Sequence, residues 1–171
     1  MALYEFTVRL DRIPDDDGLN ALYEAGLDDS TPEIGDGIAL LHMAREADSL
    51  ARSIVTAVAD IERAGYQAVG IESEDLVTLA DIAARTGRTR ESVRLLSLGK
   101  RGPGGFPAPV TSGTWALYSW AMVREWFRTH YGDQSVTPVD SDADTLTAAD
   151  LLLRARLLTP DMNELNQLVA V

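Results

Sequence analysis

The sequence predicts an α+β fold, and three observations lead to this prediction. The hydrophobic pattern changes between a period of two and a period near 3.6 up to about residue 73, as it does where strands and helices alternate. Beyond residue 75, strand patterns nearly vanish and helical patterns remain. The length of 171 residues suits one ordinary domain or two small ones, and a hydrophobic fraction of 46% is typical of a globular protein.

The N-terminal part begins with a predicted strand, helix and two further strands. Residues 4–10 alternate apolar and polar side chains of β-favouring types, as in a strand buried on one face. The acidic residues 15–17 would lie in the first turn of a helix that ends at Gly26. Residues 38–45 predict a strand, and the glycine-containing turn before them predicts a shorter strand near Pro32–Ile34.

A second helix and a last strand complete this part. Ser49 can cap a helix that Gly65 ends, and residues 66–71 predict a strand. One face of the helix is apolar and carries Leu50, Ile54, Ala57, Val58 and Ile61. The order β-α-β-β-α-β over residues 1–73 predicts a ferredoxin-like domain.

The middle of the chain predicts two short helices joined by a glycine turn. Residues 76–86 predict the first, opened by the capping-box pair Thr78 and Asp81 and ended by Gly87. Residues 89–98 predict the second, capped by the threonine at its start. Its inner side chains, Val93 and Leu96, would pack on Leu79, Ile82 and Ala83. Two such helices are typical of a helix-turn-helix.

A hairpin and a third helix would complete this domain, which we place at residues 75–131. The stretch 99–109 is rich in glycine and proline and predicts a loop. Residues 110–118 predict a β-hairpin, or wing, around Thr111–Thr114. Ser119 would cap a helix whose apolar face carries Trp120, Val123, Trp126 and Phe127. The sequence therefore predicts a winged helix-turn-helix.

The last part of the chain predicts an acidic linker at residues 132–145 and a helical tail at residues 146–171. Four aspartates and almost no apolar residues mark the linker. The tail has two apolar stripes separated by the Thr159–Pro160 pair, namely Leu151, Leu152, Ala155 and Leu158, then Met162, Leu165, Leu168 and Val169. We expect the tail either to pack back on the protein or to mediate dimerisation.

The formal net charge of −12 argues against nucleic acid as a partner, because phosphate contacts supply much of the binding energy there. The charge is unevenly distributed, however. Residues 1–74 hold 5 basic and 16 acidic side chains, residues 75–131 hold 8 and 4, and residues 132–171 hold 2 and 7. The middle segment is therefore a cationic module, at +4, between two acidic segments.

Four stretches of this cationic module follow one another in a specific order: Leu79–Gly87, Arg88–Arg94, Phe106–Pro109 and Trp120–Trp126. With them, residues 76–130, about a third of the chain, resemble the winged helix-turn-helix domains of the MerR superfamily and the related excisionase-like proteins. The resemblance implies binding to double-stranded DNA, with helix 89–98 in the major groove and wing 110–118 on the backbone or minor groove. The MerR regulators typically continue into a long dimerising coiled coil and an effector region, whereas here about 40 residues follow and the extra domain lies in front, so we do not carry over their effector sensing.

The resemblance also implies which residues contact DNA. They are Arg88, Thr89, Arg90, Ser92 and Arg94 at the second helix, Lys100 and Arg101 in the loop, and Ser112 and Thr114 in the wing. An arginine in the first turn of this helix can read guanine through two hydrogen bonds. For Arg85 and Arg124 we expect ordinary solvated charges instead.

Other chemistry has little support in the sequence. There is no cysteine, so disulfides, thiolate nucleophiles and zinc–thiolate sites are excluded. The loop Gly99–Gly105 lacks the order of a phosphate-binding motif, and Asp140–Asp144 lacks the glycine and glutamate that a calcium loop needs. The two histidines, His42 and His130, have no evident metal-binding companions. We expect no enzyme activity, no cofactor and no metal.

The sequence thus predicts a sequence-specific DNA-binding protein, most simply a homodimeric transcriptional regulator. The acidic domain at residues 1–73 would sense a small ligand, dimerise or bind a partner. The alternative is an antitoxin-like or adaptor protein that binds a protein partner through this domain or the tail and uses DNA binding only for autoregulation. Without an apolar run long enough for a membrane helix, and without a signal-peptide pattern, we expect a cytoplasmic protein with no membrane contact.

Overall fold

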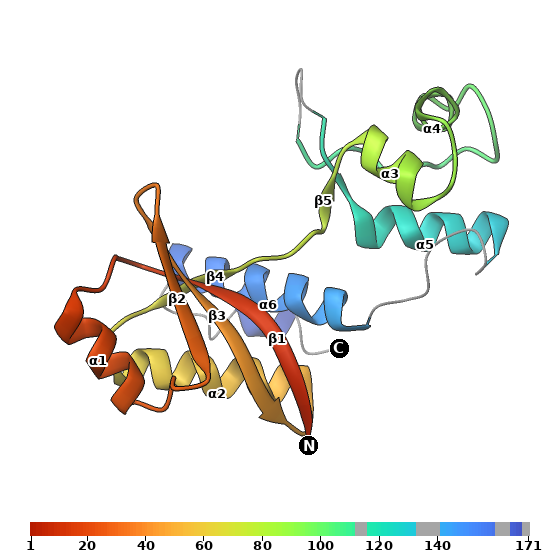
Figure 1. The fold of residues 1–171 in the computed structure, drawn as a ribbon. Helices are drawn as coiled ribbons and strands as arrows, with labels where there is room; N and C mark the ends of the chain where they lie inside the picture. Colours follow the sequence, from red (N-terminus) through yellow and green to blue (C-terminus); the bar gives the residue numbers. More distant parts are fainter. Residues whose placement is uncertain (112–115, 133–140, 160–164, 169–171) are drawn as a thin grey trace. The chain divides into compact units, whose positions relative to one another are not determined.

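The computed structural model describes residues 1–111, 116–132, 141–159 and 165–168 (Figure 1). The chain divides into two compact units. The first comprises Met1–Glu72 and Thr145–Val171, and the second comprises Ser73–Asp144. Each unit has its own cluster of buried apolar side chains.

The first unit is built on a four-stranded antiparallel sheet, which confirms the predicted α+β class. Its strands are β1 (Ala2–Leu10), β2 (Ser30–Gly35), β3 (Ile38–Ala47) and β4 (Ala68–Ile71). They lie in the order β2-β3-β1-β4, so the first and third strands of the chain are central and the second and fourth are at the edges. The predicted short strand near Pro32–Ile34 is thus present as β2.

The sheet has one buried face and one open face, as the period of two predicts. In β1 the side chains of Phe6 and Val8 are buried, and their partners across the β1–β3 ladder are Met43 and Leu41, which are buried too. Because paired residues in adjacent strands point to the same side of a sheet, these four line one face. The residues that alternate with them in β1, Glu5, Thr7 and Arg9, point to the other face and are themselves partly or fully exposed, while Leu40 of β3 is buried on that face.

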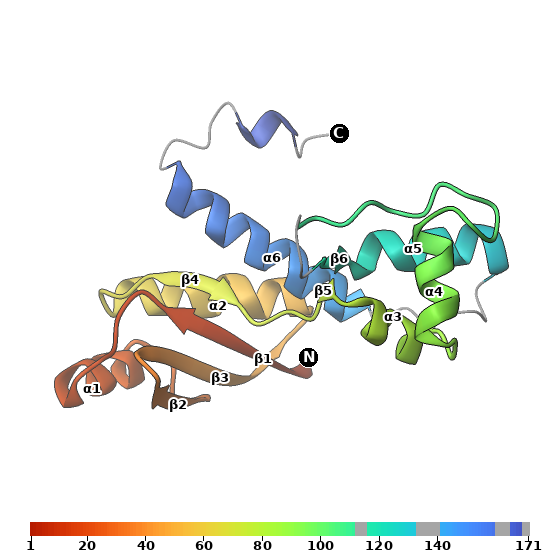
Figure 2. The same cartoon turned by 90° about the horizontal axis from the view of Figure 1, so that it is seen from above.

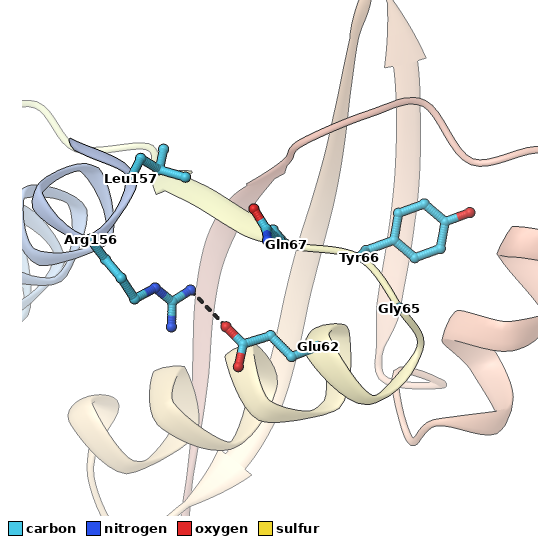
Figure 3. Close-up of a pocket in the computed structure, with 6 residues that line it drawn as sticks. All are labelled: Glu62, Gly65, Tyr66, Gln67, Arg156 and Leu157. Atoms are coloured by element: carbon cyan, nitrogen blue, oxygen red, sulfur yellow. Dashed lines mark ion pairs between the residues drawn. The ribbon is translucent and has the colours of Figure 1, made fainter. Parts of the chain in front are cut away.

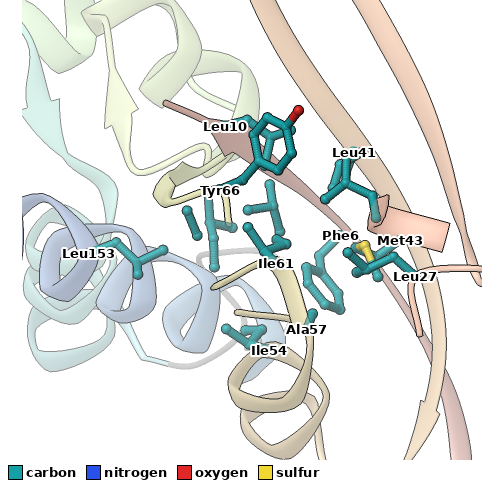
Figure 4. Close-up of a cluster of buried hydrophobic side chains, with 14 of the residues drawn as sticks. Phe6, Leu10, Leu27, Leu41, Met43, Ile54, Ala57, Ile61, Tyr66 and Leu153 are labelled. Atoms are coloured by element: carbon teal, nitrogen blue, oxygen red, sulfur yellow. The ribbon is translucent and has the colours of Figure 1, made fainter. Parts of the chain in front are cut away.

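Two helices, α1 (Asp16–Glu24) and α2 (Leu50–Arg63), cover the buried face. Asp15 caps α1 and Ser49 caps α2, each by accepting a hydrogen bond from a backbone amide in the first turn. Both helices are followed by a glycine with positive φ, as predicted from Gly26 and Gly65. Figure 4 shows Ile54, Ala57 and Ile61 of α2 packed toward the sheet residues Phe6, Leu41 and Met43 in one cluster.

A buried arginine links the loop after α1 to α2. Arg45 on β3 is only 7% exposed and uses all five of its N–H groups. It donates twice to the carboxylate of Asp29, once to Asp60, once to the hydroxyl of Thr56 and once to the carbonyl of Gly26. A buried charge satisfied in this way holds three separate chain segments in place.

Helix α6 (Ser141–Leu158) packs on the first unit through its residues from Thr145 onward. The carboxylate of Asp150, 5% exposed, accepts a hydrogen bond of 3.0 Å from the backbone amide of Ile71 in β4 and pairs with Arg154. Leu153 is buried in the core of this unit. Figures 1 and 2 both show α6 beside β4, so the helix protects an otherwise open edge of the sheet.

One expectation for this region is wrong, because the helix begins at Ser141, within the stretch expected to be a linker (132–145). The expected apolar stripe is not the side of α6 that packs on the first unit, since Leu151, Leu152 and Leu158 are 58%, 48% and 87% exposed. Dimerisation through this stripe stays a prediction. The buried side of α6 is one position away, at Leu153, because Asp150 fixes the rotation of the helix at β4. After α6, a short 3-10 helix covers Leu165–Leu168, while Pro160, Met162 and Val169 lie outside the described residues.

Between Leu76 and Tyr131, the described residues of the second unit form three helices and a two-stranded sheet. They are β5 (Leu76–Val77), α3 (Leu79–Arg85), α4 (Arg90–Ser97), β6 (Tyr118–Ser119) and α5 (Trp120–Tyr131). The predicted caps Thr78, Thr89 and Ser119 each cap their helix. Leu76 and Val77, expected in the first helix, instead pair with Ser119 and Tyr118 as strands. None of the described helices is long and apolar enough to span a bilayer.

Replacing Asp150 with alanine should lower the free energy of unfolding by about 2 kcal/mol, because it leaves the buried amide of Ile71 without a partner. Urea unfolding of the full chain would measure this as a lower midpoint with an unchanged slope. Arg154→Ala removes the exposed partner of the pair and should cost only about 0–1 kcal/mol. Equal losses in the two variants would mean that the ion pair, and not the bond to β4, holds the helix.

Candidate nucleic-acid interface

The predicted helix pair is formed by α3 and α4, which are joined by residues 86–89. At the start of α3, the amide of Asp81 donates to the hydroxyl of Thr78, and the Asp81 carboxylate accepts from the Thr78 amide and hydroxyl. Hydrogen bonds from the Thr78 hydroxyl and amide hold the pKa of Asp81 below its ordinary value. Gly87, with φ of +62°, makes the turn between the helices. The capping box and the glycine turn are confirmed.

Helix α4 has a buried side and an exposed side. Val93 and Leu96 are at most 2% exposed and share a cluster with Ile82 and Ala83 of α3, as predicted. With 3.6 residues per turn, Arg90 and Arg94 lie about 40° apart around the helix and both are exposed. Ser92 is half-buried and, by the same count, lies about 160° from Arg94, so it is not on the arginine face.

The exposed side of α4 has a carboxylate among its cations. Glu91 Oε2 accepts from Arg94 Nε at 2.8 Å, and Glu91 Oε1 accepts from Arg94 Nη2 at 2.7 Å. The hydrogen bonds from Arg94, followed by the positive charges of Arg94, Arg90 and Lys100, hold the pKa of Glu91 below its ordinary value. The same bonds raise the pKa of Arg94. Three cations therefore lie close enough to act on one carboxylate, and we call Arg90, Arg94 and Lys100 the basic cluster.

Lys100 and Arg101 follow directly from the end of α4. The amide of Lys100 donates to the carbonyl of Leu95, and Gly99 has a φ of +65°, so the helix ends in a tight turn that only glycine adopts easily. Both basic side chains are exposed. The described residues offer no ion pair to either of them.

The glycine-rich loop after α4 is held by an aromatic cluster. The indole Nε1 of Trp126 on α5 donates to the carbonyl of Gly104 at 3.0 Å. Phe106, next in the loop, packs edge-on against Trp126, with ring centroids 4.9 Å apart, and contacts Tyr118 and Phe127. The Phe106 stretch that contributes to the resemblance is thus the anchor of the loop that carries Lys100 and Arg101.

Two other nominated residues have structural roles at this site. Arg88 lies over the rings of Tyr131 and Phe127, 4.5 and 5.3 Å from their centroids, which keeps it half-buried beside the turn. The hydroxyl of Thr89 is engaged as the cap of α4 and accepts from the Ser92 amide. The structure therefore brings together Arg90, Arg94 and Lys100, and assigns Arg88 and Thr89 to supporting positions.

The two arginines expected to be solvated are not. Arg124 is 8% exposed, and its Nη2 donates to Asp144 at 2.5 Å. Arg85 pairs with Glu74 at 3.1 Å and lies over the ring of Trp120. Both expectations are wrong because each arginine lies on an inner helix face, where a partner distant in the sequence reaches it.

The segment predicted to form the wing, residues 110–118, is only partly described. Ser112 and Thr114, the two nominated residues, lie outside the described residues together with Gly113 and Trp115. On either side of them, the amide of Val110 donates to the carbonyl of Leu117, and the amide of Leu117 donates to the hydroxyl of Thr111. These bonds close the loop, but in the described residues no strand covers 110 or 111, and β6 pairs with β5.

Outside this interface, the first unit contains a cavity of about 580 Å³ lined by Glu62, Gly65, Tyr66, Gln67, Arg156 and Leu157 (Figure 3). Arg156 of α6 and Glu62 of α2 form an ion pair of 2.7 Å across it. The cavity is large enough for a small ligand of the acidic domain. Ligand sensing by this domain stays a prediction. The part of the chain that the structure describes contains no group of three or more potential metal ligands.

His42 also has a place that the sequence did not indicate. On the open face of the sheet, its Nδ1 is 3.0 Å from the hydroxyl of Thr7 and its Nε2 is 2.6 Å from Glu33. Thr7 on β1 is the register partner of His42 on β3, and Glu33 on β2 lies two residues beyond Thr31, the β2 partner of His42. The histidine thus links three strands.

Sequence reasoning missed Glu91, which lies among the nominated cations. The signal was present, since a glutamate three residues before an arginine on a helix is positioned to pair with it. It also missed the pairing of Arg124 with Asp144, which lie 20 residues apart, and no local pattern could reveal that contact.

No known protein family, curated protein or solved structure matches this chain.

Replacing Trp126 with phenylalanine keeps a ring in the cluster but removes the hydrogen bond to Gly104. We expect backbone amides in residues 99–105 to exchange about fivefold faster, as the loss of one net hydrogen bond implies. Hydrogen-exchange mass spectrometry would measure this. Trp120→Phe is the matched control, because Trp120 is equally well buried but lies over Arg85 and is not bonded to the loop. Equal acceleration in both variants would show that the bond does not hold the loop.

Proposed function

We propose that residues 75–131, within the second unit, form a winged helix-turn-helix domain that binds double-stranded DNA sequence-specifically, and that the protein is a transcriptional regulator. The proposal joins the resemblance to the MerR superfamily and excisionase-like proteins with the geometry of the second unit. Helix α4 would enter the major groove and the wing would contact the backbone or minor groove.

The helix pair supports this proposal by its construction. A turn of four residues containing Gly87 joins α3 to α4, which is the connection that helix-turn-helix motifs use. In Figure 1, α4 is seen nearly end-on while α3 runs across the view, so the two helices are steeply inclined to each other. The inner side of α4 is fixed by Val93 and Leu96, which leaves its outer side available for a ligand.

The single observation that carries the proposal is the basic cluster. Arg90, Arg94 and Lys100 lie on the exposed side of α4 or directly after it, and each is close enough to Glu91 to affect its pKa. The rest of the chain is acidic and gives the protein a net charge of −12. A polyanion is therefore attracted to this surface and repelled elsewhere, which favours DNA contact through α4.

For the first unit we propose a ferredoxin-like fold. The strand order β2-β3-β1-β4, with α1 and α2 on one face of the sheet, supports it. The helix α6 is an addition to that βαββαβ unit. Its docking at the edge strand β4 leaves its opposite side exposed.

We further propose that this exposed side of α6 pairs two copies of the chain. It carries Ala148, Leu151, Leu152, Ala155 and Leu158 at spacings of three and four residues, as helix-pairing seams do. If two α6 helices pair antiparallel about position 153, Ala148 lies opposite Leu158 and Leu151 opposite Ala155 of the second copy. In this register Leu158 and Leu151 each meet an alanine of the second copy. A dimer also suits the proposed function, since one module buries only about 600–1,000 Å² on DNA.

The DNA prediction concerns the double variant Arg90→Ala with Arg94→Ala. We expect wild-type protein to select a common motif from a library of random duplexes and to lose roughly tenfold or more in affinity between 50 and 200 mM salt. The double variant should bind the selected duplex at least about tenfold more weakly and show a shallower salt dependence, because it contacts fewer phosphates and bases. Fluorescence anisotropy with labelled duplexes would measure both.

The matched control is Arg9→Ala with Arg52→Ala, which removes the same two charges from exposed positions of β1 and α2. It should change binding far less than the first variant. If wild-type protein enriches no motif and binds no duplex at 50 mM salt, or if both double variants weaken binding equally, the proposed function is wrong.

The dimer prediction concerns Leu151→Asp. A charge in the middle of the proposed seam should raise the dimer dissociation constant by about tenfold or more, because a carboxylate would be buried against the apolar Ala155 of the second copy. Sedimentation velocity over a concentration series would measure the change. Val55→Asp on α2 is the control, since Val55 is 59% exposed against 58% for Leu151. If wild-type protein stays monomeric at all concentrations, the homodimer proposal is wrong. The exposed side of α6 would then bind a different protein, as in the adaptor alternative.

A further inference from the structure

Helix α4 carries one acidic residue, and it lies on the face proposed to meet DNA. Glu91 is two residues after the cap Thr89, where the positive end of the helix favours a carboxylate. Its side chain is 61% exposed, so burial does not explain the pairing with Arg94. A carboxylate at this place is unfavourable for phosphate binding, because both groups are negative. A surface built only for tight DNA binding would not contain it.

The geometry of the pair shows what the carboxylate does to Arg94. Both carboxylate oxygens are used, and on the guanidinium the Nε–Nη2 edge is used, at 2.8 and 2.7 Å. Such a two-point contact fixes the plane of the guanidinium, which a single hydrogen bond does not. The Nη1 end then points away from Glu91. Arg94 is thereby held in one orientation and partly neutralised.

We propose that Glu91 is the specificity-determining residue of this surface, which it makes selective for a base pair at the expense of phosphate binding. This inference rests on the proposed function. Held by Glu91, Arg94 presents its free end to the O6 and N7 acceptors of a guanine, which are fixed in the major groove. A phosphate would have to compete with Glu91 for the same guanidinium and would lie close to its negative charge. A duplex with guanine at this position gains the contact with Arg94. A duplex with another base loses that contact and lies next to the negative charge of Glu91.

The consequence is a trade of affinity for selectivity. Non-specific binding depends on the number of phosphates that the cations neutralise, whereas discrimination depends on contacts with base edges. Pairing with Glu91 takes Arg94 out of the set of cations that neutralise phosphates and leaves it available for contact with a base edge. Its loss should therefore strengthen binding to arbitrary DNA more than binding to the correct sequence.

The experiment compares Glu91→Ala with Glu125→Ala in the full chain. Glu125 is the matched control, because it also pairs with an arginine three residues later, Arg128 at 3.3 Å, and is 66% exposed, but lies on α5. Each variant changes the net charge by +1 and removes one exposed pair. The probes are the duplex that wild-type protein selects from a random library and a scrambled duplex of the same composition. Affinities for both are measured by fluorescence anisotropy from 50 to 200 mM salt.

In Glu91→Ala we expect tighter binding to the scrambled duplex, with a salt slope steeper by about one phosphate contact, and a fall in the ratio of specific to non-specific affinity of about tenfold. In Glu125→Ala the ratio should stay within about twofold. A second selection with Glu91→Ala should return a motif that is weaker at one guanine position.

An unchanged ratio in Glu91→Ala, or equal changes in both variants, would overturn this inference while leaving DNA binding intact. Failure of the proposed function has a different result, since wild-type protein would then select no motif in the first step. Thermal unfolding of each variant separates these outcomes from loss of the fold.

Discussion

The hydrogen bond from the indole of Trp126 to the carbonyl of Gly104 is the contact that anchors the loop after α4. The loop it holds contains glycines at 99, 102, 104 and 105, all with positive φ, and such a sequence loses much conformational entropy when it becomes ordered. At Gly102 a Cβ would come within 2.6 Å of the Leu96 side chain, so the loop lies tightly on the inner side of α4. The aromatic cluster thus fixes the segment that carries Lys100 and Arg101.

The acidic first unit meets a different electrostatic requirement. Within residues 1–74 sixteen carboxylates compete with five basic groups, and carboxylates near one another repel. Arg45 offsets this where the chain is most crowded, by taking the carboxylates of Asp29 and Asp60 into one network with a buried guanidinium. At the edge strand, Asp150 has the opposite role, because a backbone amide and Arg154 stabilise a buried negative charge. Some of the excess carboxylates in this unit therefore stabilise the fold, because they form hydrogen bonds and ion pairs between separate chain segments.

The features that the sequence predicted have local signals, and those it missed depend on distant partners. Helix starts at Ser49, Thr78 and Thr89 follow from a side chain that accepts a hydrogen bond from an amide three residues on, and helix ends at glycines follow from φ. The strand at Leu76 was missed because it exists only through pairing with residue 119. The sequence did not show which side of α6 is buried, because apolar residues lie on more than one side of this helix. The buried side is selected by the hydrogen bond between Asp150 and the amide of Ile71, which lie 79 residues apart. In the site, spacing placed Arg90 and Arg94 on one face, but it could not show which cations a carboxylate would bind.

The difference between local pattern and context is clearest in two pairs of equal spacing. Glu91 with Arg94 and Glu125 with Arg128 are both glutamate–arginine pairs three residues apart on helix surfaces. The first is bidentate and is reinforced by the charges of Arg90 and Lys100, while the second has one described contact of 3.3 Å. Among surplus cations a carboxylate gains neighbours and stays ionised to lower pH, so it can hold an arginine in a fixed orientation. In a protein with a net charge of −12, a cationic surface is needed to admit DNA at all, and one carboxylate within it is what can make that surface selective.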